Sequence, residues 1–154
     1  MELVIAINAG STTAATMNEV RYQADQYFTG GEVNGTTDAI IGVVDDEVYQ
    51  SERYGAVTYN VPVTNSRYSV VLHFVEMFHS TAGARAFNVT VEGETVLNAL
   101  DIYSLSGHDG AFEYIVEDVD VSDGTLTIAL TMLTENPTIS GFAIYSDAGG
   151  RLAP

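Results

Sequence analysis

Short runs in which apolar and polar residues alternate recur along this chain, and they limit its fold more than any other feature. They occupy residues 58–63, 67–77, 86–91, 112–121, 125–133 and 139–146. Successive side chains of a strand point to opposite faces, so a period of two indicates strands with one face in a core. Turn signals such as Ser122-Asp123-Gly124 separate the runs, and no long stretch shows the apolar period of a helix. We therefore predict an all-β fold, a two-sheet antiparallel β-sandwich of the jelly-roll type.

The stretch from Thr29 to Asp46 lacks this alternation. Glycine, asparagine and aspartate surround a short apolar run, which predicts a long loop containing one buried turn or helical stub. Long ordered loops in a compact domain are usually functional. This one leads directly into Tyr49 and Tyr54, so we expect it to have a functional role.

The length of 154 residues and the hydrophobic fraction of 46% fit one domain with a substantial core. We expect the domain to cover residues 1–146 and residues 147–154 to form a linker stub. The longest apolar runs are far shorter than the roughly 20 residues that cross a bilayer. Met1 is followed directly by Glu2 and a strand-like run, so we expect no secretion signal here, as in a module excised from a longer protein.

Acidic residues outnumber basic ones by 21 to 5, all five basic residues are arginine, and the net charge is −16. Such a charge repels phosphate backbones and anionic lipid, so we exclude nucleic acids and membranes as partners. An acidic surface also keeps a protein soluble in salty surroundings, and the composition does not separate salt adaptation from calcium use. The chain has no cysteine, which excludes disulfides, thiolate metal sites and a cysteine nucleophile and leaves the compartment open.

Four segments follow one another in an order that carries a family resemblance. They are VYQSERYG at 48–55, YSVVLHFVEMFH at 68–79, RAFNV at 85–89 and VLNALDI at 96–102. Asn8-Ala9-Gly10 and residues 24–31 fit the same pattern near the start. Together they resemble the malectin family, whose members are carbohydrate-binding β-sandwich domains. The resemblance covers almost the whole chain and implies sugar binding among long loops at one end of the sandwich, without catalysis and without a cofactor.

The resemblance also implies which residues contact the sugar, because aromatic residues and one acidic residue hold the ligand in this family. The matching positions are Tyr54, Phe78, His79 and Glu135, and the aromatics nearest to an unmatched tyrosine position are Tyr27 and Phe28. An aromatic ring can stack on the apolar C–H face of a sugar, and a tyrosine hydroxyl can also hydrogen-bond to its hydroxyl groups. The alternative for each ring is ordinary packing, and for Glu135 it is a solvated turn carboxylate.

Two of these positions depart from the family pattern. His79 replaces a larger aromatic residue, which reduces the stacking surface and introduces a pH-sensitive group. Glu135 replaces aspartate and reaches about one methylene farther. The glucosyl-disaccharide preference of the animal proteins is therefore not carried over to this chain.

Glu52, Arg53 and Glu76 invite a catalytic interpretation, because two carboxylates near a guanidinium group could serve glycoside hydrolysis. The resemblance argues against it, and we expect a paired strand carboxylate beside Arg53 to anchor a loop. We therefore predict no catalytic residue and no enzyme. His73 lies within a strand-like run, where a satisfied packing residue is a more common role than a metal ligand.

The remaining polar segments give weaker signals. Gly107-His108-Asp109-Gly110 predicts a tight turn, in which His108 or Asp109 could border the sugar site. The three histidines do not show metal-site spacing, and Asp118, Asp120 and Asp123 lack the glycine and glutamate of an EF-hand. We expect Asp118 and Asp120 to lie on a solvent face of a strand. Structural calcium stays open, and no residue is assigned as a metal ligand.

The sequence thus predicts a carbohydrate-binding module for neutral oligosaccharides or polysaccharide of glucan or galactan type. We expect it to target a larger multidomain protein, secreted or at the cell surface, to glycan. The alternative is a structural or adhesive domain of a surface protein that binds calcium or a protein partner and has no active sugar site. The sugar, its linkage and the oligomeric state are left open.

Overall fold

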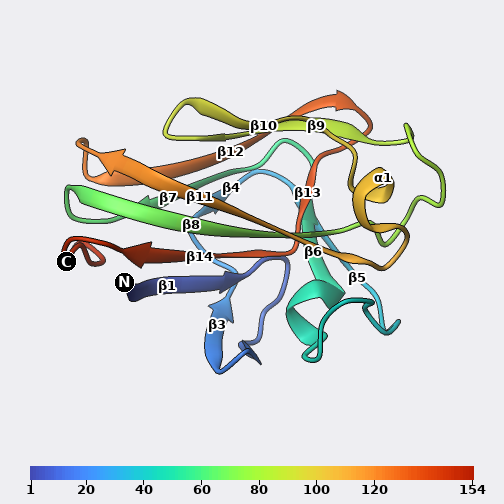
Figure 1. Ribbon diagram of the computed structural model, residues 1–154, viewed down its shortest axis with the longest axis horizontal. Helices are drawn as coiled ribbons and strands as arrows, with labels where there is room; N and C mark the ends of the chain where they lie inside the picture. Colours follow the sequence, from blue (N-terminus) through green and yellow to red (C-terminus); the bar gives the residue numbers. More distant parts are fainter.

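Two main β-sheets face each other in the computed structural model, which describes residues 1–154 (Figure 1). The first contains, in spatial order, β11 (Ala111–Val121), β8 (Ser66–Val75), β14 (Gly141–Ser146), β1 (Glu2–Asn8), β3 (Val20–Ala24) and β2 (Ala15–Met17). The second contains β10 (Glu94–Leu100), β9 (Ala86–Val91), β12 (Thr125–Thr134), β7 (Thr58–Pro62) and β4 (Phe28–Thr29). A small third sheet contains β13 (Thr138–Ile139), β6 (Ser51–Tyr54) and β5 (Glu32–Gly35). The helical segments are the 3-10 helix η1 (Glu47–Gln50) and the α-helix α1 (Ile102–Ser106).

The eight principal strands follow the order of a jelly roll. Along the chain, β1, β8, β11 and β14 belong to the first sheet, whereas β7, β9, β10 and β12 belong to the second. The order β11-β8-β14-β1 therefore faces the order β10-β9-β12-β7, and this arrangement confirms the predicted all-β jelly-roll sandwich. The pair of β1 and β3 is parallel, with Ile7 opposite Gln23, so the pairing is not antiparallel throughout.

The core lies between the two main sheets and consists of alternate residues of the long strands. Fully buried side chains include Tyr68, Val70, Leu72 and Phe74 of β8, Tyr59 and Val61 of β7, Phe87 and Val89 of β9, and Leu126 and Ile128 of β12. Burial of one large apolar side chain stabilises a fold by about 1.5–3 kcal/mol. These strands therefore form a rigid frame on which the loops at either end are supported.

The structure corrects the prediction of one long loop over residues 29–46. Residues Glu32–Gly35 form β5, which pairs with β6 in antiparallel register, and the helical turn follows later as η1. All four residues of β5 are exposed, so the strand has no buried face and no apolar alternation to reveal it. The predicted strand at 139–146 is also divided at Ser140, because β13 joins the third sheet and β14 the first.

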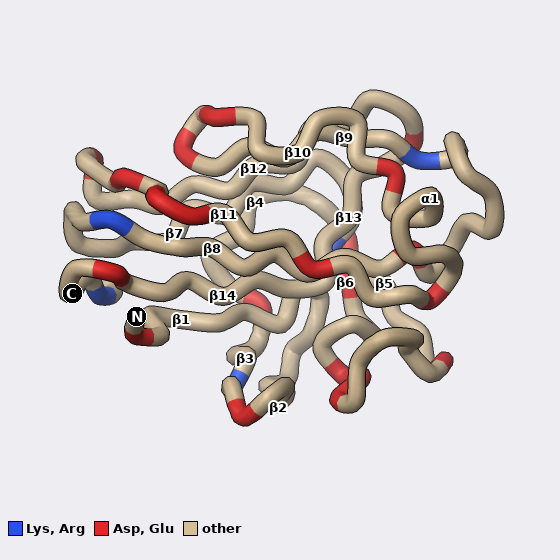
Figure 2. Tube along the Cα trace, in the orientation of Figure 1, with Lys and Arg blue, Asp and Glu red and all other residues tan.

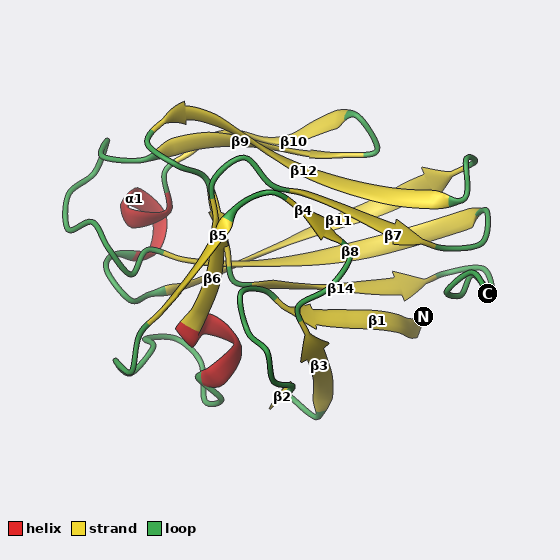
Figure 3. Cartoon of the chain, turned by 180° about the vertical axis from the view of Figure 1, so that it is seen from behind, coloured by secondary structure: helices red, strands yellow, loops and turns green.

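Both chain ends lie at one end of the sandwich (Figure 1). β1 pairs with β14, with Glu2 opposite Ser146. Leu152 forms a bridge with Val63, which brings the last residues onto the domain; the division at residue 146 remains a prediction. The opposite end carries η1, α1 and the loop of residues 76–85, as the view from behind also shows (Figure 3).

Acidic residues are spread over strands and loops rather than gathered in one patch of the view (Figure 2). Asp118 and Asp120 are exposed on β11, as predicted, and Asp118 lies at a bulge between Val116 and Val119. Neither helical segment has the length and hydropathy that crossing a bilayer requires.

A buried polar network covers the outer face of β8 at His73. Its Nε2 atom lies 2.8 Å from the Tyr22 hydroxyl and its Nδ1 atom 2.7 Å from the Tyr49 hydroxyl. This confirms His73 as a satisfied packing residue. Burial lowers the pKa of His73 from 6.5 to about 4. The carboxylate of Glu113, 3.8 Å from Nδ1, is half exposed and does not reverse this shift.

We expect mild acid to destabilise the domain through His73. The unfolded chain takes up a proton near pH 6.5, whereas the folded chain does so only near pH 4, so the stability from neutral His73 is lost as the pH falls between these values. Between pH 7 and pH 5 the free energy of unfolding, measured by urea denaturation, should fall by about 2 kcal/mol through this group. His73→Gln, which does not titrate, should show a correspondingly smaller fall. Equal losses in both proteins would contradict the assignment.

Candidate functional site

A cleft of about 310 Å³ opens at the end of the sandwich that carries the long loops. It lies where β5, β6, the 76–85 loop and the turn between β12 and β13 meet. The lining residues combine two aromatic rings with amides and charged groups: Asn34, Glu52, Tyr54, Phe78, Arg85, Glu135 and Asn136.

The alternation of β6 decides which of its side chains enter the cleft. Glu52 and Tyr54 line it, whereas Arg53 between them points to the other side of the strand. There the Nε atom of Arg53 donates to Asp25 at 2.8 Å, and its guanidinium carbon lies 3.4 Å from the centroid of the Phe28 ring. The short strand β6 thus lies between the cleft and the ion pair of Arg53 with Asp25.

Glu52 forms the polar floor of the cleft and is only 3% exposed. The hydroxyl of Thr138 donates to its Oε1 atom at 2.6 Å, and the amide of Asn34 donates to its Oε2 atom at 3.2 Å. Asn34 and Glu52 face each other across the β5–β6 register. The carboxylate therefore joins β13, β6 and β5 beneath the cleft.

A second buried carboxylate, Glu76, anchors the loop that carries Phe78. Arg85 donates to it through Nε at 2.7 Å and through Nη2 at 3.2 Å, and the main-chain N–H groups of Phe78 and His79 donate at 3.2 and 3.1 Å. Burial alone would raise the pKa of Glu76, but these hydrogen bonds outweigh it and hold the pKa below its ordinary value. The loop-anchoring role is confirmed, although the partner is Arg85 and not the expected Arg53.

The rim of the cleft is formed by side chains that remain accessible. Phe78 is 70% exposed, and its ring meets the ring of His79 edge-on at 4.9 Å. The Tyr54 hydroxyl donates to Glu32 at 3.2 Å, and this hydrogen bond raises the pKa of Tyr54. Glu135 has a φ of 62°, which turns the chain sharply between β12 and β13 and places its side chain at the rim. Rings and a carboxylate are thus presented together to solvent.

Of the six candidate sugar contacts, Tyr54, Phe78 and Glu135 line this one cleft. The other three do not. His79 supports Phe78 from the side, and Tyr27 packs against the core between the sheets. Phe28 lies under Arg53 on the other side of β6. Their assignment as contacts gains no support from their positions.

Sequence reasoning did not identify Asn34, Glu52, Arg85 and Asn136 as parts of the cleft. Asn34 reaches it through the unpredicted strand β5. Arg85 reaches it through its ion pair with Glu76 and its contact with the main-chain carbonyl of Asn136. The one available signal was the position of Asn136 directly after Glu135.

His108 and Asp109 do not line the cleft, although the tight turn predicted for them is present. They lie just before β11, and the carboxylate of Asp38 from the β5–η1 loop approaches them. These three side chains offer the candidate ligands for a metal ion.

A family model described as "Malectin domain" matches residues 3–149. Malectin-A of Xenopus laevis is 27% identical over 137 residues, which cover 82% of this chain and 49% of that protein. Kinesin-like protein KIN-14Q of Arabidopsis thaliana is 31% identical over 153 residues, 96% of this chain and 12% of that protein. The chain therefore spans about half or less of the length of these relatives.

Solved structures share the fold at lower identity. The beta-glucuronidase of Bacteroides uniformis gives a TM-score of 0.81 at 18% identity, covering 94% of this chain and 18% of that one. The extracellular domain of ANXUR2 from Arabidopsis thaliana gives a TM-score of 0.78 at 17% identity, covering 96% of this chain and 49% of that one. Identities this low establish the common fold alone.

We expect Arg85→Ala to lower the free energy of unfolding by about 3 kcal/mol, because it leaves the Glu76 carboxylate buried without its counter-charge. Urea denaturation at neutral pH measures the change. Arg67→Ala removes an exposed arginine with no ion pair and should cost less than about 0.5 kcal/mol. Similar small losses in both variants would show that the pair does not hold the loop.

Proposed function

The chain belongs to the malectin domain family, a family of carbohydrate-binding folds, and on that premise we propose that it is a non-catalytic module that binds carbohydrate in the cleft of Tyr54, Phe78 and Glu135. The observation that carries the proposal is the exposed Phe78 ring beside Tyr54, above a floor of hydrogen-bonded polar groups. Other large apolar side chains are exposed on this chain, so the support comes from the place of the Phe78 ring, which lines a cleft together with the Tyr54 ring and polar groups. A sugar ring would supply a matching C–H face.

The polar lining supports binding of hydroxyl groups. Asn136 offers an amide, which both donates and accepts. Asn34, whose amide nitrogen already donates to Glu52, offers its oxygen as an acceptor, and Glu135 offers two acceptor oxygens. Arg85 is 5% exposed and largely committed to Glu76. These groups match the hydroxyl groups along the edge of a sugar, which both donate and accept hydrogen bonds, better than they match a ligand with one fixed charge.

The charge of the site favours a neutral sugar. Glu52 and Glu135 line the cleft, the only lining cation is already paired, and the chain carries a net charge of −16. Uronic acids and sulfated sugars would meet like charge there. The volume of about 310 Å³ is at the low end for ligand sites, which favours a short stretch of a neutral oligosaccharide or polysaccharide. The glucan or galactan type remains a prediction.

The state of the buried carboxylates supports binding without catalysis. Glycoside hydrolysis requires a carboxyl group that holds a proton at working pH, which means a raised pKa. Glu76 has a lowered pKa and accepts four hydrogen bonds. Glu52 is held by Thr138 and Asn34. Both side chains position the loops around the cleft.

The size of the relatives supports a role within a larger protein. The chain covers 49% of Malectin-A and 12% of KIN-14Q, and it matches 49% of an ANXUR2 chain described as an extracellular domain. We infer a module that holds a multidomain protein, secreted or at the cell surface, on its glycan.

We expect Phe78→Ala to weaken binding of the recognised oligosaccharide about tenfold, or about 1.4 kcal/mol, through loss of ring stacking. A glycan array of neutral glucan and galactan oligomers identifies the ligand, and isothermal titration calorimetry measures the affinity. Tyr54→Phe, which keeps the ring and removes the hydroxyl, should weaken binding only a few-fold. Tyr54→Ala should weaken it at least as much as Phe78→Ala does.

Phe28→Ala is the matched control, because Phe28 is also an exposed aromatic residue but lies outside the cleft. It should leave the glycan affinity unchanged. Loss of binding in Phe28→Ala with retention in Phe78→Ala would move the site to the other side of β6. An array without any signal from the folded domain would reject the sugar-binding proposal and favour the structural or adhesive alternative.

A further inference from the structure

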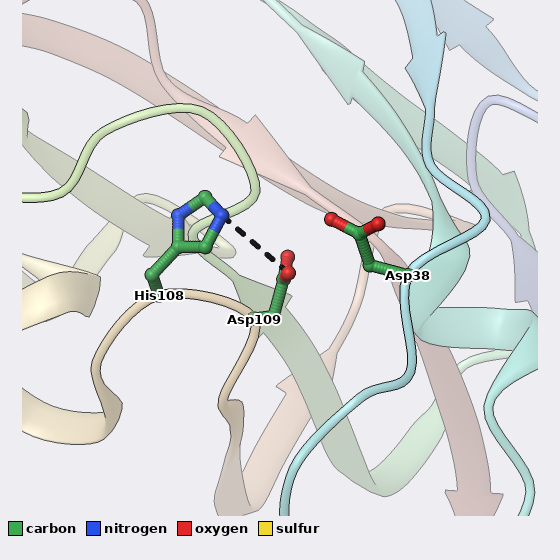
Figure 4. Close-up of side chains that lie close together, drawn as sticks. All are labelled: Asp38, His108 and Asp109. Atoms are coloured by element: carbon green, nitrogen blue, oxygen red, sulfur yellow. Dashed lines mark ion pairs between the residues drawn. The ribbon is translucent and has the colours of Figure 1, made fainter.

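Three potential metal ligands that do not line the cleft converge at one point (Figure 4). Asp38 comes from the loop after β5, and His108 and Asp109 come from the turn between α1 and β11. One ligand atom from each lies within 4.8 Å of the others, and the Asp109 carboxylate stands between the imidazole and Asp38 in the view. Residues about 70 positions apart in the chain are thus brought to one point by the fold.

The imidazole of His108 is oriented as metal-ligating histidines usually are. Its Nδ1 atom lies 2.9 Å from the main-chain carbonyl oxygen of His79. A carbonyl oxygen only accepts, so Nδ1 carries the proton, and in the neutral ring Nε2 keeps its lone pair. That Nε2 atom lies 3.4 Å from Oδ2 of Asp109. Two lone pairs facing each other at this distance require a proton or a cation between them.

Asp109 is the buried member of the group, and one of its oxygens has no partner. The residue is 8% exposed, and its Oδ1 atom is buried and accepts no hydrogen bond within the protein. An unpartnered buried carboxylate oxygen costs free energy that a bound cation would recover. The cluster therefore contains a buried acceptor oxygen that a cation could coordinate.

The main chain holds the two segments in place without a ligand. The N–H of Ile41 donates to the Asp109 carbonyl at 2.8 Å, and the N–H of Ala111 donates to the Ile41 carbonyl at 2.9 Å. The N–H of Asp109 also donates to the Glu76 carbonyl at 2.9 Å. Ligands on fixed backbone lose little conformational entropy when they bind a metal, which favours affinity.

We propose that Asp38, Asp109 and the Nε2 atom of His108 form a binding site for a borderline divalent transition-metal ion of the Zn²⁺ type. Two carboxylates and one imidazole match the ligands of Zn²⁺, with water completing the coordination on the exposed side of Asp38. Ca²⁺ is the poorer match, because it takes six to eight oxygen ligands and does not favour imidazole. The site is independent of the proposed sugar binding.

Isothermal titration calorimetry of the EDTA-stripped and dialysed chain with ZnCl₂ tests the site, with excess Mg²⁺ to occupy the acidic surface. We expect one ion per chain, and we expect His108→Gln and Asp38→Asn each to weaken binding by about 100-fold or more. Co²⁺ should give visible d–d absorption that disappears in His108→Gln. Asp120→Asn, an exposed carboxylate on β11, is the matched control and should leave the affinity unchanged.

The experiment can be interpreted even if one variant folds poorly. Asp38 is exposed, so Asp38→Asn leaves the buried Asp109 in place. Unfolding temperatures measured in EDTA verify the fold of each variant. Zn²⁺ binding that survives both His108→Gln and Asp38→Asn would show adventitious binding to the acidic surface and would overturn the proposal. So would the absence of stoichiometric binding, or Ca²⁺ binding of equal strength.

Discussion

The buried ion pair of Glu76 and Arg85 is the interaction on which the functional end of this domain depends. Glu76 directly follows β8, which lies between β11 and β14 in the first sheet, and Arg85 directly precedes β9 in the second. The same guanidinium group reaches the carbonyl of Asn136 in the turn between β12 and β13. One pair of charges therefore fixes three chain segments around the cleft. Burying a charge without its partner costs free energy, so replacing either residue alone should lower the free energy of unfolding.

This arrangement explains how an exposed aromatic ring keeps a defined position. The Phe78 side chain is accessible, but its main-chain N–H and that of His79 are held by the Glu76 carboxylate. The His79 carbonyl in turn accepts a hydrogen bond from His108. The loop is thus held through its backbone by the buried Glu76 carboxylate, without burial of the Phe78 ring. An ordered loop loses less entropy when a ligand covers it.

The sequence predicts the strands of the two main sheets better than it predicts the loops around the cleft. The long strands could be located because their buried residues alternate, whereas β5 could not, since all four of its residues are exposed. Tyr54, Phe78 and Glu135 could be brought together only through the family resemblance, which carries information about the fold. Tyr27 and Phe28 were chosen as the aromatics nearest to an unmatched position of the family pattern, and neither lines the cleft; Phe28 lies in β4, which pairs with β7.

Local sequence patterns could not predict the contacts between distant loops. The hydrogen bond from Arg85 to Asn136 joins residues separated by 51 positions. The approach of Asp38 to Asp109 depends on the pairing of Ile41 with the turn before β11. In both cases a single side chain looks unremarkable in the sequence, and its partner is set by how the two sheets and their loops are placed. Spacing rules for metal ligands did not apply to His108 for the same reason.

The position of the chain ends determines how far an attached polypeptide would lie from the cleft. β1 and β14 bring both ends to the pole opposite the cleft, and β11, with 11 residues, runs between the poles. At about 3.3 Å per residue this strand is roughly 35 Å long. A polypeptide joined at either end would be kept that far from whatever occupies the cleft. The sandwich would then serve as a stiff spacer as well as the support of the cleft.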